Sequence, residues 1–440
     1  MKADGLAQHE YAKPEGGWQE RTYRKISWRL FPIIISCYFV AFLDRTNIGI
    51  AKLQMDSELG LSEAAYGLGA GLFFIGYVLL EVPSNLYMYK IGAKRTISRI
   101  MVLWGIVATC FMFVHSPAEY YGLRLLLGAC EAGFFPGIIL YLTYWFPSDM
   151  RARAIGIFIV AQPVSGLVGG PLGGWILKSL NHVDGFSGWK WLFLIEGLPS
   201  IILGVAVIWL LTDTPQKAKW LTQREKDLVL GELDRDRELK KSFTSHSLGD
   251  LVRDKYVILL VFLVFAESMG LYGLSFWLPT LVKNAGVHST LMAGVVTAAP
   301  YACGAIAMIL VSRSSDRRHE RKWHLSVPFC VTALGIAASV ALGGNTIAAL
   351  VALCLAGAGA YTVSALCWNV PPAFFSGVAA AAGIAGINAL GNLGGFVSPY
   401  LIGLSQTLGG SSTLGFYILS GVLVLGAILT HLLPTDRVNR

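Results

Sequence analysis

Charged residues are scarce in this chain. Only 14% of its 440 residues are Asp, Glu, Lys or Arg, whereas 54% are hydrophobic. A soluble globular protein carries about 25% charged residues. The composition therefore excludes an ordinary soluble domain and indicates an integral membrane protein.

Motifs for nucleotide binding and covalent chemistry are also missing. No G-x4-G-K-[ST] loop occurs, so ATP-driven transport is not expected. No nucleophile motif or His-rich cluster suggests an enzyme. The seven cysteines form no C-x-x-C pair and have no His partners, so we expect them to pack as small apolar residues. They are Cys37, Cys110, Cys130, Cys303, Cys330, Cys354 and Cys367. We predict no metal site, no catalytic residue and no cofactor apart from a coupling proton.

Long apolar runs fill most of the chain. Each is about 20 residues long, which suits a membrane-spanning helix better than a membrane β-strand. The predicted fold class is therefore an all-α integral membrane protein with twelve transmembrane helices in two pseudo-symmetric six-helix bundles. The predicted spans are 28–50, 64–87, 96–115, 119–142, 153–178, 189–211, 256–281, 290–312, 324–343, 346–369, 378–403 and 413–433.

A polar stretch divides these spans six and six. The predicted organisation is a cytoplasmic N-terminal tail (1–27), an N-terminal bundle (28–211), a central cytoplasmic loop (212–255), a C-terminal bundle (256–433) and a cytoplasmic C-terminal tail (434–440). We expect the loop to be a solvated tether between the bundles rather than a regulatory module.

The basic residues are distributed unevenly. With the N-terminus placed in the cytoplasm, most of the 35 Lys and Arg residues fall in cytoplasmic segments, as the positive-inside rule requires. The net charge of +8 is then a topology signal, and we expect no nucleic-acid partner. The predicted location is the inner (cytoplasmic) membrane of a cell, with both termini cytoplasmic and the chain a monomer in the lipid bilayer.

Four charged residues interrupt the apolar spans: Asp44 and Arg45 in the first, Arg124 and Glu131 in the fourth. A charge at the centre of a membrane helix costs about 2.5–3.5 kcal/mol on insertion scales, so such residues usually face a bundle interior or a watery cavity. Arg124 and Glu131 lie two helical turns apart on one face, and an ion pair between Arg124 and Asp44 is geometrically possible. Two cations and two carboxylates together predict a site that binds an anion and exchanges a proton. The alternative, which stays open, is that these charges form ion pairs whose role is only to hold the helices together.

The two halves of the chain echo each other in their basic turns. Residues 312–322 (SRSSDRRHERK) resemble the signature G-x3-D-[RK]-x-G-x-[RK]-[RK] of the major facilitator superfamily. The first-half copy, residues 85–95 (NLYMYKIGAKR), has Tyr89 at the acidic position. The resemblance implies a transporter built from two six-helix halves with its substrate between them. It also implies a gating role for Asp316 and Arg317.

A narrower resemblance covers nearly the whole chain. Five segments in order are similar to the anion:cation symporter family: FLDRTNIGIAKLQM, GYVLLEVPSNL, RLLLGACEAGFFPGIILYLTYWFP, YGLSFWLPTLVK and GNLGGFVSPYLIG. Its bacterial members move sugar acids, tartrate, phthalate and other carboxylates with protons. The resemblance implies that Arg45 and Arg124 handle the anion. It implies that Asp44 and Glu131 couple the anion to protons.

Polar residues in other spans complete the predicted binding site. The resemblance matches Tyr77 and Gln162 to the family's mid-span tyrosine and span-five amide, and Asn388 is expected to orient hydroxyl or carbonyl groups of the ligand alongside them. Trp368 either covers the substrate or anchors a helix end at the membrane interface.

Three more polar residues receive weaker assignments. Glu267 and Asn392 are possible secondary site residues. Glu196 lies near the start of its span and is expected to reach the headgroup region.

The predicted function is import of a small organic carboxylate (a sugar acid, a hydroxy-dicarboxylate or an aromatic acid) by proton symport with alternating access. The four intramembrane charges sum to zero, so a bound carboxylate adds one negative charge that protonation of Glu131 or Asp44 removes. The alternative is a proton-coupled exporter or antiporter of drugs or other organic ions, which we expect to have cavity acids without paired arginines. A receptor, a further alternative, is expected to carry a substantial soluble domain.

Overall fold

The computed structural model describes residues 16–241, 254–371, 374 and 377–438, and this part of the chain is almost entirely helical. The first half contains α1 (Gly16–Leu59), α2 (Glu63–Ile91), α3 (Ala93–Cys110), η1 (Phe111–Phe113), α4 (Pro117–Glu131), α5 (Phe134–Thr143), α6 (Ser148–Ile159), α7 (Ala161–Ser179) and α8 (Gly188–Leu210). The second half contains α11 (Lys255–Asn284), α12 (Thr290–Arg318), α13 (Lys322–Ala341), α14 (Thr346–Cys367), α15 (Gly377–Gly409) and α16 (Thr413–Thr430). The remaining helices are η2 (Pro215–Lys217), α9 (Gln223–Lys241) and α17 (Thr435–Val438).

Each predicted span corresponds to one helix or to a broken pair of helices. Eleven helical segments among the described residues are long and apolar enough to cross a membrane. α15 is not one of these eleven, but its 33 residues pack against α2 and α11 where the span 378–403 was predicted. The all-α, multi-span fold class is therefore confirmed.

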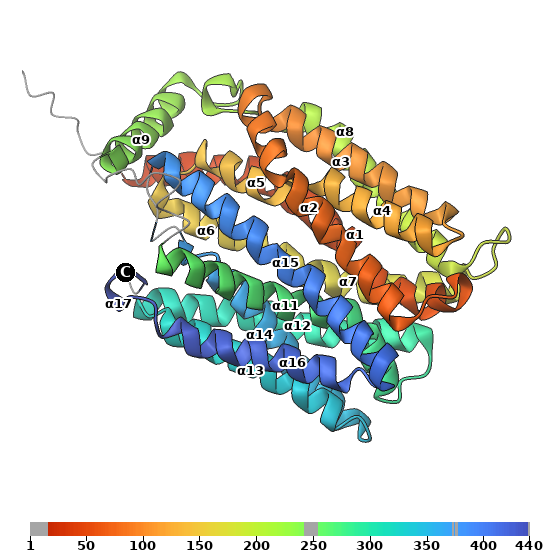
Figure 1. The fold of residues 1–440 in the computed structure, drawn as a ribbon. Helices are drawn as coiled ribbons and strands as arrows, with labels where there is room; N and C mark the ends of the chain where they lie inside the picture. The colour runs from red at the N-terminus through yellow and green to blue at the C-terminus, as the bar shows by residue number, and fades with distance from the viewer. Residues whose placement is uncertain (1–15, 242–253, 372–373, 375–376, 439–440) are drawn as a thin grey trace, which may run out of the picture.

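The long helices run side by side in two groups, α1–α8 and α11–α16 (Figure 1). The groups meet where α2 packs on α15, α7 on α12 and α1 on α11. Glycines make these contacts close: a Cβ on Gly170 would lie 2.7 Å from the carbonyl oxygen of Gly294, and one on Gly67 would lie 2.3 Å from that of Pro399. Small residues let membrane helices approach at backbone distance. The two halves therefore pack at backbone distance at these glycines, and a larger side chain there would push the helices apart.

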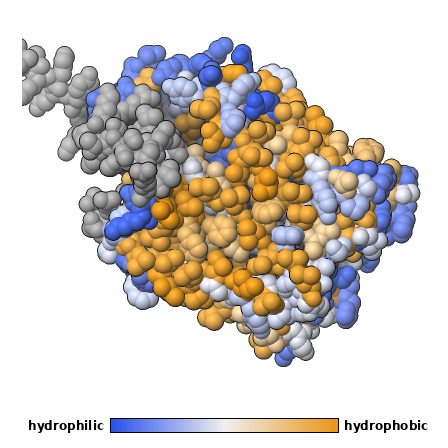
Figure 2. Space-filling model, in the orientation of Figure 1, coloured by the Kyte–Doolittle hydropathy of each residue, from blue (hydrophilic) through white to orange (hydrophobic). Residues whose placement is uncertain are grey.

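Hydrophobic side chains cover the middle of the face shown in Figure 2, and hydrophilic side chains gather toward the ends of the helices. One polar end carries α9, α17 and the start of α1 (Figure 1). Such a belt between two polar ends is what a helix bundle needs to lie in a bilayer. Exposed Leu, Ile and Trp side chains on the helices are accordingly expected to meet lipid.

The two basic turns each have a residue with positive φ at matching positions. Gly92, between α2 and α3, has φ 101°, and His319, between α12 and α13, has φ 50°. Both φ values lie in the region that glycine adopts without strain. Gly92 has ψ 158° as well, a combination that requires glycine. His319 has ψ 36°, in the left-handed helical region, which a residue with a side chain can adopt at a modest cost.

The described part of the central loop docks on the first half. Tyr23 on α1 donates a hydrogen bond of 2.6 Å to Glu232 on α9, and Lys25 pairs with Glu225 at 2.9 Å. α9 is thus held against α1 by these contacts, while most of its described side chains stay exposed or half-buried. Its role as a solvated tether between the bundles stays a prediction. Residues 242–253 of the predicted loop lie outside the described residues.

Candidate functional site

Arg45 on α1 is the centre of the candidate site. Its buried guanidinium donates through Nη1 to the hydroxyl of Tyr272 on α11 at 2.6 Å and through Nη2 to the carboxylate of Glu131 on α4. The guanidinium carbon lies 5.1 Å from the centroid of the Phe73 ring and 5.4 Å from that of Tyr77. Aromatic rings attract a cation at such distances. Side chains of both halves therefore hold one cation inside the membrane-spanning part.

Glu131 sits where its predicted span is interrupted. α4 ends at Glu131, the chain turns through Gly133 with φ 86°, and α5 begins at Phe134. Pro136 accounts for the break, because it has no N–H to donate and its ring would clash with the carbonyl of residue 132 in a continuous helix. Interrupted membrane helices are typical of transporter binding sites. The sequence prediction of one continuous span missed this break, although Gly133 and Pro136 signal it.

A polar cavity between the halves brings seven of the predicted residues together. These are Arg45, Tyr77, Gln162, Glu267, Trp368, Asn388 and Asn392. Its other lining residues are Tyr38, Phe135, Ser268, Leu271, Tyr272 and Ser364. Arg45 is the one Lys or Arg among them. The free volume is about 30 Å³, which is room for little more than a water molecule. A ligand of several carbon atoms therefore requires these side chains to move apart.

Polar side chains in the cavity join the two halves. Gln162 on α7 donates to the hydroxyl of Tyr38 on α1 at 2.6 Å and accepts from Ser364 on α14 at 3.3 Å. Nearby, the rings of Phe135 and Trp368 lie 5.5 Å apart, again with one from each half. Trp368 thus faces the cavity, a position that suits covering a ligand better than anchoring a helix at the membrane surface.

Asn388 is tied to an acid on the opposite half. Its Nδ2 donates to the carboxylate of Glu81 on α2, and Asn392 donates to Asn388 Oδ1 at 2.9 Å. Glu267, on α11, is buried and accepts from Ser268 at 3.2 Å. Amides and acids from both halves therefore surround the space beside Arg45.

Arg124 lies outside the cavity lining. It is fully buried on α4 and donates to backbone carbonyls of α2, at 3.0 Å to Ala70 and 3.4 Å to Gly69. Its guanidinium carbon is 5.1 Å from the centroid of the Phe73 ring, the same distance as that of Arg45. The two predicted anion-handling arginines therefore contact one phenylalanine, but only Arg45 reaches the cavity in this conformation.

Asp44 does not pair with Arg124, and the prediction that these two side chains could pair is wrong. Its Oδ2 accepts from the indole of Trp104 on α3 at 2.9 Å and from Ser200 on α8 at 2.6 Å. Successive residues on a helix point about 100° apart. Asp44 accordingly faces α3 and α8, while Arg45 faces α4 and α11.

The predicted gating residues are not among the residues that line the cavity. Asp316 and Arg317 are exposed on the last turn of α12, beside the turn that contains His319. They lie at the end of α12, just before the start of α13, as the predicted turn requires. Their gating role stays a prediction.

Sequence reasoning missed several aromatic and hydroxyl residues of the site. Tyr272 binds Arg45 directly, and Tyr38 and Ser364 hold Gln162. Tyr272 opens the segment YGLSFWLPTLVK, so its presence in a resembling block was a usable signal. Tyr38 and Ser364 carried no comparable signal, because a lone hydroxyl in an apolar run is common.

Comparisons with known proteins agree with this architecture. The Major Facilitator Superfamily matches residues 34–399. A protein of Agrobacterium vitis, provisionally named a tartrate transporter, is 44% identical over 94% of this chain and 92% of its own. A quinolone resistance transporter of Acinetobacter baumannii is 38% identical over 94% of this chain and 95% of its own. The partially occluded inward-open xylose transporter XylE of Escherichia coli shares the fold, with a TM-score of 0.72, 16% identity and coverage of 91% and 97%. The chain belongs to the major facilitator superfamily and is a multi-pass membrane transporter, not an enzyme.

Proposed function

We propose that this transporter imports a small organic carboxylate together with one or more protons. The observation that carries the proposal is the contact between Arg45 and Glu131. Arg45 is the cavity's cation, and in this conformation a carboxylate already occupies it. Guanidinium groups bind carboxylates through paired N–H donors. A substrate carboxylate is therefore expected to take the place of Glu131.

Protonation of Glu131 is the step that releases Arg45. If Glu131 stayed ionised while a substrate carboxylate took its place, two negative charges would lie close together in a dry cavity. Unit charges ~4 Å apart at an effective dielectric of ~20 interact by about 4 kcal/mol. Since 1.36 kcal/mol equals one pKa unit, proton binding and anion binding would help each other by up to roughly a thousandfold.

The remaining cavity groups suit a hydroxylated acid. Gln162, Asn388 and Asn392 offer amides, and Tyr77 and Tyr272 offer hydroxyls. Such groups bind substrate hydroxyls and discriminate against analogues that lack them. The relative of Agrobacterium vitis is named for tartrate, a dihydroxy dicarboxylate. Tartrate is therefore the first substrate to test.

Drug export is the second candidate function. It is favoured by the 38% identity to a quinolone resistance transporter. Quinolone antibiotics also carry a carboxylate, so Arg45 suits either cargo, and the direction of transport distinguishes them.

The orientation and surroundings form part of the proposal. We place both termini in the cytoplasm of a cell with an inner membrane, because that orientation puts most basic residues on the cytoplasmic side. We expect a monomer that works without a cofactor other than the coupling proton. Reporter fusions at each terminus test the orientation, and light scattering in detergent tests the oligomeric state.

Uptake by proteoliposomes tests the function. With the outside more acidic than the lumen, labelled tartrate should accumulate above equilibrium, and a protonophore should abolish the accumulation. Arg45→Ala should abolish uptake, whereas Arg21→Ala, at an exposed position on the same helix, should leave it unchanged. Tartrate accumulation that persists with a protonophore would rule out proton symport. Proton-driven extrusion of a quinolone without tartrate uptake would favour the exporter.

A further inference from the structure

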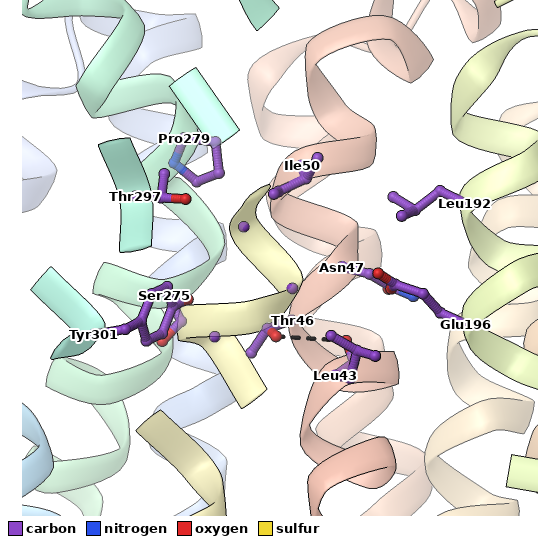
Figure 3. Close-up of a pocket in the computed structure, with 13 residues that line it drawn as sticks. Leu43, Thr46, Asn47, Ile50, Leu192, Glu196, Ser275, Pro279, Thr297 and Tyr301 are labelled. Atoms are coloured by element: carbon purple, nitrogen blue, oxygen red, sulfur yellow. Dashed lines mark hydrogen bonds between the residues drawn. The ribbon is translucent and has the colours of Figure 1, made fainter. Parts of the chain in front are cut away.

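A second polar cavity lies between the halves, away from Arg45. Its walls come from α1, α7 and α8 of the first half and from α11 and α12 of the second (Figure 3). The free volume is about 20 Å³, which is water-sized. No Lys, Arg or His is among the residues that line it. The cavity nevertheless contains an acid, Glu196, which needs either a cation or a proton.

Glu196 on α8 and Asn47 on α1 are the unusual residues of this cavity. Their exposed fractions are 1% and 5%. Both carboxylate oxygens of Glu196 and both polar amide atoms of Asn47 lack a hydrogen bond of good geometry to any described residue. The two side chains point toward one another in Figure 3. Asn47 is close enough to Glu196 to interact with it, but none of the four atoms has a well-aligned hydrogen bond. Buried polar atoms are rarely left so in native proteins, so these two facing side chains indicate that one hydrogen-bond partner between them is missing.

One proton supplies that partner. A carboxylic acid and a primary amide form a ring of two hydrogen bonds: the acid O–H donates to the amide oxygen, and the amide N–H donates to the acid carbonyl. We propose that Glu196 is a second proton-binding site, in which the protonated acid pairs with Asn47. All four polar atoms are then satisfied by a single added proton.

An ionised Glu196 has no compensating charge in this cavity. Tyr301 on α12 is the other titratable side chain that lines the cavity. Asp44 on α1 lies outside the lining but close enough to Glu196 to repel its charge, and neither residue is a cation. α3, which packs along α8, presents Ala108 and Thr109 to the backbone beside Glu196. A buried charge without a partner costs several kcal/mol, and a second carboxylate nearby adds repulsion. The neutral acid is therefore the stable form while the cavity is closed.

Closure of the cavity depends on contact between the halves. Gly166 on α7 lies against the ring of Tyr301, and Gly170 against Thr297 and Gly294 on α12. Separation of α7 from α12 would admit water to Glu196 and allow it to ionise. Proton binding to Glu196 therefore favours the conformation in which these helices meet. This site is separate from the Arg45–Glu131 pair and does not depend on which substrate is carried.

Infrared spectroscopy of the purified protein without substrate tests the site. In potassium buffer at neutral pH, Glu196→Gln should lose one carbonyl band of a protonated carboxylic acid relative to the wild type. Asn47→Leu should keep the band but shift it to higher frequency, because the acid loses its amide partner. Glu119→Gln, at an exposed position on α4, should leave the region unchanged. Thermal melts of each variant check that it is folded.

Two outcomes would overturn the assignment. If Glu196→Gln removes no acid band, Glu196 is ionised in the native protein. If sodium in place of potassium abolishes the wild-type band, the site binds a metal cation and not a proton. Neither result depends on tartrate uptake, so failure of this inference is distinguishable from failure of carboxylate symport.

Discussion

The carboxylate of Glu131 is paired with the buried guanidinium of Arg45, the group to which a substrate carboxylate is expected to bind. The acid stands at the end of α4, directly before the break at Gly133, and the arginine is fixed on α1 by Tyr272 as well. In the proposed mechanism, this acid and the substrate compete for one cation, which would link proton binding to substrate binding without a long-range conformational change. Protonation of Glu131 would free Arg45, and loss of substrate would allow Glu131 to ionise again.

Removal of the Glu131 charge should separate binding from coupling. Glu131→Gln is expected to keep tartrate exchange across proteoliposomes but to lose proton-driven accumulation, because the side chain no longer changes charge. Counterflow and net uptake of labelled tartrate measure the two activities. Glu119→Gln, on the exposed face of the same helix, is the matched control and should behave as wild type. Full accumulation by Glu131→Gln would assign the coupling to another acid.

Arg124 should matter for stability as well as for transport. Arg124→Ala removes the donors to the carbonyls of Gly69 and Ala70, and a buried unpaired polar group costs about 1–3 kcal/mol. We expect loss of tartrate uptake together with a lower unfolding temperature. Arg45→Ala should abolish uptake with at least as large a thermal effect, because the buried carboxylate of Glu131 loses its cationic partner. Fluorescence-detected melting of both variants checks this order, and an unchanged melting temperature for Arg124→Ala would show that its backbone contacts are dispensable.

The hydroxyl of Tyr66 should stabilise the conformation in which α2 and α11 are in contact. The hydroxyl of Tyr66 on α2 donates to the backbone carbonyl of Phe276 on α11 at 3.0 Å, whereas the hydroxyl of Tyr120 donates to the backbone carbonyl of Tyr66 within the first half. A hydrogen bond contributes about 0.5–1.5 kcal/mol, so Tyr66→Phe should shift the equilibrium about two- to tenfold toward separation of α2 from α11. Spin-label distances between these helices measure the shift. Tyr120→Phe, the matched control, should not change the population.

The docked central helix can be tested independently of transport. Glu232→Gln weakens the charge-assisted bond from Tyr23 that holds α9 on α1, and we expect faster tryptic cleavage after Arg224 and Lys226. Asp227→Asn, which among the described residues alters a contact to Gln223 within α9, should leave the rate of cleavage after Arg224 unchanged. Equal rates for both variants and wild type would show that Glu232 does not hold the helix.

Polar residues of the cavity could be predicted from the sequence, because polar and charged side chains cost free energy inside a membrane span and therefore stand out in an apolar run. Seven predicted residues, Arg45 among them, line one cavity. Partners were harder to predict: depth along a helix placed Asp44 and Arg124 at one level, but depth says nothing about which way each side chain points. Glu196 was expected to reach the headgroups, yet it is 1% exposed. Its position near the start of a span does not reveal that α1 and α3 cover it.

Proton uptake on substrate binding is the most direct test of the coupling between Arg45 and Glu131. Calorimetric titration of tartrate into the purified transporter, in buffers of different ionisation enthalpy, gives the number of protons taken up for each anion bound. Near neutral pH we predict uptake approaching one proton in the wild type and none in Glu131→Gln, which should still bind tartrate. Tight tartrate binding to the wild type without proton uptake would contradict the exchange of carboxylates on Arg45.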